Sequence, residues 1–264
     1  MKTIYLILAT CLLFSCKSAF EEIRRSNDPK ATLEAANKYY EEEDYLKAQA
    51  LYELAISFYR GKSEAEDLYY NYAYTYYHLN QYTLAAYYFN NFTKTFYNST
   101  RKEEIAFMAA YSNYKLSPSY KLDQQPSVTA IDQLQVFINT YPSSPRVDES
   151  NKLIDEMREK LETKSFEQAN LYYKLNNYQS AMASFENLLK DYPETKRQEL
   201  VRLLVIKSNY ELAKKSVYEK MQKRLEDTIE KCNKFERKFP DSKDLGEVKD
   251  IKDFCYNELK RFVQ

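Results

Sequence analysis

The stretch SEAEDLYYNYAYTYYHLNQYTLAAYYFNNFTKTFYN, residues 63–98, decides the fold of this chain. It holds two patterns of similar length, separated by a polar step at residues 79–81. In each half, apolar and aromatic side chains recur at the three- and four-residue spacing of an amphipathic α-helix. The small residues Ala73 and Ala85 lie where two antiparallel helices would touch. The stretch therefore predicts a helix hairpin with small residues at its crossing.

Copies of this hairpin recur along the chain, with a pair of small residues at each crossing. These pairs are Ala36 and Ala48, Ala73 and Ala85, Ala110 and Ala130, and Ala169 and Ala181. A looser fifth copy follows around Thr228 and Cys232. The wider spacing in the third copy indicates an insertion at residues 116–126. About five such units indicate an all-α solenoid of tetratricopeptide-like (TPR-like) hairpins, closed by a C-terminal capping helix.

The expected helices follow from these repeats and from the proline stops that end several of them. They lie at residues 28–42, 45–59, 64–79, 82–97, 101–115, 127–140, 146–175, 178–191, 195–215, 219–238 and 244–262, with a break expected near residue 163. Asp28 and Pro29 are typical of a helix start. Ser63 with Glu66, and Thr195 with Gln198, are spaced as capping boxes, as is the pair Thr100 and Glu103.

The first residues are expected to be an export and anchoring segment rather than part of the repeats. Residues 1–15 have a short basic start and an apolar run too short to span a bilayer, which is typical of a signal peptide. They end in Leu-Phe-Ser before Cys16, which resembles a bacterial lipobox, so Cys16 is the expected lipidation site. An ordinary secretory signal with a chance cysteine is the alternative. Residues 16–27 would then be a polar tether, reaching at most about 40 Å.

Composition excludes several classes of function. The 39 acidic and 39 basic side chains cancel and are interspersed, so nucleic acid is not an expected partner. Two glycines in the whole chain leave no phosphate-binding loop, and His78 is the only histidine, so neither an enzyme nor a metal or other cofactor is expected. An oxidising compartment permits a disulfide between Cys232 and Cys255, and two buried thiols are the alternative.

Function is expected on the concave surface that the first helix of each hairpin lines. In the TPR frame, the side chains facing inward are Leu33, Asn37 and Tyr40 in the first unit, Tyr70, Tyr74, Tyr77 and His78 in the second, and Phe107, Tyr111 and Tyr114 in the third. Aromatic rings with polar tips suit an extended peptide that carries aromatic side chains. Because tyrosine is abundant throughout the chain, the alternative is that many of these rings only fill gaps between repeats.

The whole arrangement resembles the BamD family of outer-membrane assembly lipoproteins. The matching stretches are YEEEDYLKAQALYELAISFY, YAYTYYHLNQYTLAAYYFNNFTKTFYNS, AAYSNYKLSPSYKLDQQPSVTAIDQLQVFINTYPSSP and LYYKLNNYQSAMASFENLLKDYP. The third stretch looks most like members from Bacteroidetes. The likeness covers about residue 29 to the C-terminus. The first two units depart from the family pattern, because they close in Tyr-Arg and Tyr-Asn rather than Tyr-Pro.

The resemblance implies a lipoprotein of the outer membrane that faces the periplasm. By resemblance to lipoprotein sorting rules, Lys17 after the cysteine also favours the outer membrane. It implies that repeats 1–3, residues 28–145, recognise unfolded outer-membrane β-barrel proteins. Residues 146–264 would dock on the POTRA domains of the barrel insertase BamA, and other Bam lipoproteins would be further partners. The alternatives are another periplasmic TPR lipoprotein that serves as a scaffold for envelope or peptidoglycan proteins, or a glycan-binding lipoprotein.

Overall fold

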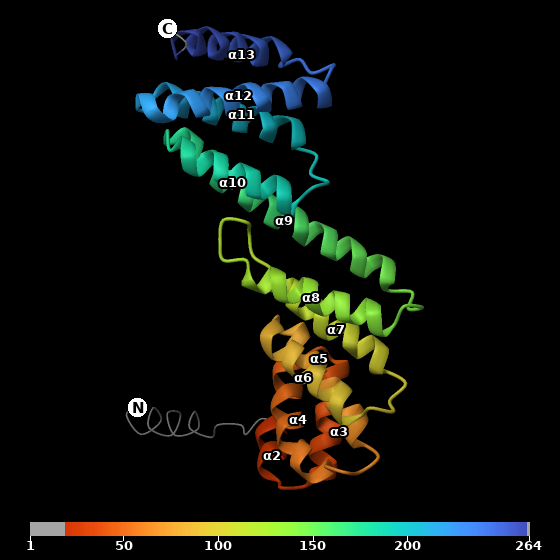
Figure 1. The fold of residues 1–264 in the computed structure, drawn as a ribbon. Helices are drawn as coiled ribbons and strands as arrows, with labels where there is room; N and C mark the ends of the chain where they lie inside the picture. Colours follow the sequence, from red (N-terminus) through yellow and green to blue (C-terminus); the bar gives the residue numbers. More distant parts are fainter. Residues whose placement is uncertain (1–18, 263–264) are drawn as a thin grey trace, which may run out of the picture. The chain divides into compact units, whose positions relative to one another are not determined.

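The computed structural model describes residues 19–262, and all regular secondary structure among them is helical. The helices are α2 (Ala19–Arg25), α3 (Pro29–Glu41), α4 (Tyr45–Tyr59), α5 (Ala65–His78), α6 (Tyr82–Thr95), α7 (Lys102–Lys115), α8 (Gln125–Thr140), α9 (Val147–Lys174), α10 (Tyr178–Asp191), α11 (Gln198–Lys214), α12 (Tyr218–Lys238), α13 (Leu245–Leu259) and the 3₁₀ turn η1 (Lys260–Phe262). Figure 1 shows α3 to α12 as consecutive pairs. The expected TPR-like hairpins, one after another, are thus confirmed.

The hairpins are held together by the small residues that the sequence singled out. Among these, Ala36, Ala48, Ala73 and Ala85 are fully buried, and the corresponding residues of the third and fourth hairpins are exposed by no more than 2%. Without a larger side chain between them, the two helix backbones can approach closely. In the fifth hairpin Thr228 and Cys232 are fully buried at the crossing. The capping helix α13 packs on this hairpin through Val248, Ile251 and Cys255.

Three of the hairpin turns share one backbone geometry. Glu43, Asn80 and Asn176 have φ of 60°, 58° and 57°, in the left-handed region. The next residue donates its N–H to a carbonyl five residues earlier, as Gln81 does to Tyr76 at 2.9 Å. This is the Schellman ending of a helix, which satisfies carbonyls that the helix leaves open. It fixes the reversal of the chain between the first and second helix of these hairpins.

The sequence missed one helix and predicted one break that does not exist. Helix α2 occupies seven residues of the expected tether, stabilised by ion pairs from Glu21 to Arg24 and Arg25 one turn later. The Phe20 ring also contacts the Tyr39 ring of α3 edge-on, at 6.0 Å between centroids. The expected tether is therefore helical over Ala19–Arg25. Helix α9 continues through residue 163 without interruption.

The expected capping boxes do not form, although the Asp28 cap does. Asp28 Oδ1 accepts the backbone N–H of Lys30 at 2.9 Å. In contrast, α5, α7 and α11 start one to three residues later than expected, and no side chain caps them. Thr195 instead accepts the N–H of Arg197 two residues on, at 3.0 Å. Thr195 therefore shapes the turn before α11 rather than capping the helix itself.

The chain divides into two compact units. The first holds the residues up to Pro118 together with Asp123–Asp155, and the second holds Ser119–Leu122 and the residues from Glu156 onward. This division falls after Asp155, inside α9, whereas the boundary at residue 145 between a substrate-facing and a BamA-facing half stays a prediction. Because α9 is unbroken there, the division does not coincide with a loop. The first unit contains hairpins α3–α4, α5–α6 and α7–α8.

Cys232 and Cys255 are both fully buried free thiols, so the disulfide considered from the sequence is not formed. They belong to one core cluster with Ile206, Ile229 and Phe235, where apolar side chains surround them. Burial raises the pKa of Cys232 to about 12 and that of Cys255 to about 11. Both thiols therefore stay protonated at neutral pH and act as small apolar core side chains.

Candidate peptide-binding surface

The aromatic residues expected on the first helices of the first unit form one continuous surface. The centroid of the Tyr40 ring on α3 lies 6.3 Å from that of His78 on α5, and His78 lies 5.8 Å from Tyr77. Tyr77 in turn contacts Tyr111 on α7 at 6.4 Å, and Tyr111 stacks on Tyr114 at 5.6 Å. The chain of rings therefore crosses three consecutive hairpins. We call Tyr40, Tyr77, His78, Tyr111 and Tyr114 the aromatic surface.

Every member of the aromatic surface keeps part of its side chain accessible. The four tyrosines are half-buried and His78 is exposed. Rings held by neighbouring rings lose little freedom when a ligand covers them, which favours binding. The surface therefore offers stacking faces for the apolar side chains of a partner.

Two other predicted residues, Phe107 and Asn37, make contacts that serve the structure. Phe107 is 1% exposed and packs against Phe137 at 5.5 Å, so it is a core residue and does not face a groove. Asn37 uses its side-chain carbonyl to accept a hydrogen bond from the Tyr52 hydroxyl at 2.7 Å. Leu33 is half-buried on α3. The alternative that some inward rings fill gaps between repeats is thus correct for Phe107.

Tyr70 and Tyr74 lie beside the aromatic surface but have their hydroxyls engaged. Both donate to the same carboxylate oxygen, Glu104 Oε1 on α7, at 2.9 and 2.6 Å. Burial and the Glu104 carboxylate raise the pKa of Tyr74, so the phenol keeps its proton as donor. Glu104 thus ties the second hairpin to the third beside the aromatic surface, a role that no local pattern in the sequence indicated.

The structure adds two tyrosines that the repeat frame missed. Tyr45, the first residue of α4, stacks on His78 with 4.3 Å between centroids and 8° between planes. Tyr82, the first residue of α6, contacts Tyr77 at 5.6 Å. Both follow a hairpin turn directly, so they stand next to the last turn of a first helix. Their position directly after the turn could have indicated this from the sequence, but the repeat pattern was applied only to the first helix of each hairpin.

Burial shifts the pKa of two groups of the aromatic surface, Tyr40 and His78, in opposite directions. It raises the pKa of Tyr40 to about 12, with smaller contributions from Tyr45, Tyr70 and Glu104. Partial desolvation of the His78 ring lowers its pKa, against the opposing effect of Glu43. At neutral pH the Tyr40 phenol is therefore an uncharged donor and His78 is a neutral imidazole. A surface of this kind favours aromatic and neutral polar groups.

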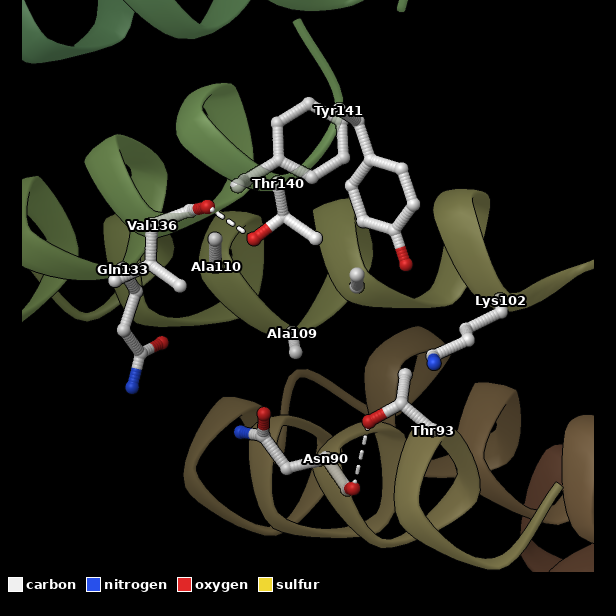
Figure 2. A pocket seen from close by; sticks show the side chains of 11 residues that line it. Asn90, Thr93, Lys102, Ala109, Ala110, Gln133, Val136, Thr140 and Tyr141 are labelled. Carbon is white, nitrogen blue, oxygen red and sulfur yellow. Dashed lines mark hydrogen bonds between the residues drawn. The ribbon is translucent and has the colours of Figure 1, made fainter. Parts of the chain in front are cut away.

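The first unit also has a cavity of about 280 Å³ between α6, α7 and α8 (Figure 2). Its floor includes Ala109 and Ala110 of α7, and its walls carry amide, hydroxyl and apolar side chains from α6 and α8. Several of these polar groups are satisfied within their own helices; Thr140 donates to the Val136 carbonyl at 2.7 Å. Lys102 is the one charged residue among those that line it. We call it the neutral cavity.

A family model described as YfiO, outer membrane lipoprotein, matches residues 25–225 and again residues 167–252. The chain belongs to the YfiO family of outer membrane lipoproteins. The two matched ranges overlap over the fourth and fifth hairpins, as internal repeats allow. No curated protein matches the sequence. The family membership supports the resemblance to BamD-like lipoproteins, and the aromatic surface lies wholly within the first matched range.

For a YfiO-family protein, the mode of membrane attachment is a central feature. Cys16 and the signal peptide expected at residues 1–15 lie outside the described residues. Among the helices that the structure describes, none is both long and apolar enough to span a membrane.

Proposed function

We propose that this YfiO-family protein is a non-enzymatic, cofactor-free component of the outer-membrane β-barrel assembly machine. It is anchored through lipid on Cys16, faces the periplasm and binds unfolded barrel proteins on the aromatic surface. The half after residue 145 binds a BamA-like insertase through its POTRA domains, with other Bam lipoproteins as further partners. The particular resemblance to family members from Bacteroidetes remains a prediction from the sequence.

The continuity of the aromatic surface carries this proposal. A single buried ring would serve packing alone, but a row of accessible rings from α3 to α7 can receive successive side chains of one extended chain. The hydroxyls and the neutral imidazole between the rings can bond to its backbone. An unfolded strand with aromatic side chains therefore fits the site by chemistry.

Two measurements test the proposal. First, the tagged full-length lipoprotein is purified from membranes in mild detergent, and its partners are quantified by mass spectrometry. A protein with POTRA domains at comparable abundance is the expected result. If another envelope complex co-purifies instead and no such protein is present, the assembly role is wrong.

Second, a fluorescent extended peptide with aromatic side chains, one of them at its C-terminus, is titrated against the protein. Tyr77→Ala and Tyr111→Ala should each weaken binding about tenfold, or ~1.4 kcal/mol. Tyr256→Ala is the matched control, because Tyr256 is an exposed tyrosine of α13 in the second unit. Binding of an oligosaccharide in place of the peptide would favour the glycan-binding alternative.

A further inference from the structure

A second elongated site lies in the second unit, where α10, α11 and α12 line it together. Two cavities, of about 220 and 390 Å³, follow each other along α11. The first lies over Arg202, Val205 and Ile206, and the second over Asn209 and Leu212. On α12 the lining runs from Glu219 to Phe235, about 24 Å of helix. We call the two cavities together the α10–α12 groove.

The α10–α12 groove has an excess of positive charge. Its basic residues are Arg202, Lys220, Lys223, Arg224, Lys231 and Lys234, and its acidic residues are Glu186, Glu219 and Asp227. Lys231 pairs with Glu186 at 2.7 Å across the groove. Lys234 pairs with Glu230, outside the lining, at 2.5 Å. Among the described residues, Lys220, Lys223 and Arg202 form no ion pair, so their charges are available to a ligand.

Arg202 indicates which kind of chemical group the groove can bind. Its Nε is buried and has no hydrogen-bond partner among the described residues. A buried N–H without an acceptor costs free energy, and a carboxylate can accept from Nε and from a terminal N–H of the same guanidinium in parallel. Apolar side chains adjoin it, namely Leu189 of α10 and Val205 of α11. The arrangement therefore suits a carboxylate next to an apolar group.

The neutral cavity of the first unit shows that this charge is not a general consequence of the repeat. Both sites lie between two second helices, above the first helix of the later hairpin. In the neutral cavity, however, the floor carries alanines and the walls are uncharged except for Lys102. The hairpin architecture thus supplies the groove, while the cations are specific to the second unit.

We propose that the α10–α12 groove binds an acidic amphipathic segment of a protein partner. Carboxylates of the segment contact Arg202, Lys220 and Lys223, and its apolar side chains pack on Met182, Leu189 and Val205. Charge complementarity argues for this occupant, because acidic side chains would neutralise the unpaired cations and aid the encounter. This inference specifies where a partner would dock on the half after residue 145. It rests on the proposed function, because that function is the reason to expect an envelope protein as the partner.

The test is photo-crosslinking of the full-length lipoprotein in cells. A photoreactive p-benzoylphenylalanine replaces Met182 in the groove or, as control, Val136 at the neutral cavity. Crosslinked peptides are identified by mass spectrometry. The expected product at position 182 is one recurrent segment with several acidic residues, absent from position 136. No crosslink at position 182, or a crosslinked segment without acidic residues, overturns the proposal.

Charge variants make the test specific for the groove. Arg202→Glu and Lys223→Glu should each reduce the crosslink about tenfold. Lys223 is exposed, so its variant is informative even if Arg202→Glu fails to fold. Lys249→Glu on α13 is the matched control, because Lys249 is an exposed lysine that does not line the groove. In the Lys223→Glu variant, changing the crosslinked acidic residue of the partner to Lys should restore the crosslink at position 182. If Lys249→Glu reduces the crosslink as much as Lys223→Glu does, or if the partner substitution does not restore the crosslink, the proposal is overturned.

These outcomes are distinguishable from failure of the proposed function. If the acidic segment belongs to a protein without POTRA domains, the groove inference stands and the BamA docking is wrong. If a BamA-like protein still co-purifies with Lys223→Glu at its full amount and nothing crosslinks at position 182, the proposed function stands and the groove inference is wrong.

Discussion

The guanidinium of Arg101, just before α7, lies 4.6 Å from the centroid of the Tyr70 ring on α5 in the preceding hairpin. Two further hairpin junctions repeat this relationship, with Arg146 over Phe107 at 4.5 Å and Arg197 over Phe166 at 5.4 Å. Each arginine also donates its backbone N–H to a Ser or Thr hydroxyl two residues earlier, at 3.0–3.2 Å. The turn thus aims the arginine at the preceding first helix.

The arginine junctions predict a measurable contribution to stability. Arg197 also pairs with Glu162 at 2.7 Å, and the two side chains are only 32% and 16% exposed. Arg197→Ala should therefore lower the free energy of unfolding by about 1–2 kcal/mol, through loss of the cation–π and ion-pair contacts. Urea unfolding measures the change. Arg158→Ala, at an exposed residue of α9, is the control and should change stability little.

Glu104 predicts a second effect, within the first unit. Glu104→Ala removes the shared acceptor of the Tyr70 and Tyr74 hydroxyls and should cost about 1–2 kcal/mol of stability. Glu104→Gln keeps an acceptor oxygen and should cost less. Glu103→Ala, at the neighbouring half-buried position on α7, controls for the loss of a carboxylate. Equal thermal midpoints for the two alanine variants would contradict the role given to Glu104.

His78 predicts a pH dependence. Burial lowers its pKa in the folded protein, so between the folded pKa and the unfolded value of about 6.5 the unfolded chain binds more protons. Stability from this group is therefore fully present above about pH 6.5 and decreases as the pH falls toward the folded pKa. In His78→Gln this share of the acid-induced loss should disappear. Urea midpoints at about pH 7.5 and about pH 5.5 test it; equal pH dependence in both proteins would refute it.

The buried cysteines predict low reactivity. Because burial raises the pKa of both thiols, neither Cys232 nor Cys255 should react with iodoacetamide in the native protein at neutral pH. Both should be labelled after unfolding in urea without a reductant, as mass spectrometry would show. Labelling that needs a reductant would reveal a disulfide between them instead of the two free thiols of the structure.

The amino-acid sequence alone determined the hairpins of this protein. Helical periodicity and the small residues at each crossing, such as Ala73 and Ala85, are local in sequence, and the repetition of one pattern supplied the packing partner of every helix. The aromatic surface followed from the same frame, since residues on one face of a first helix face the same way in each copy. The capping boxes were wrong because the same Ser/Thr spacing also suits a turn before the helix.

Only the tertiary structure decided how individual side chains are used. Phe107 is buried in the core against Phe137, and the hydroxyls of Tyr70 and Tyr74 donate to Glu104. These contacts join residues about 30 or more positions apart in the sequence. The excess of positive charge between α10 and α12 was equally hidden, since the chain as a whole has 39 charges of each sign. Local periodicity specifies which face of a helix is apolar, but the burial and pairing of one side chain depend on neighbours that only packing brings together.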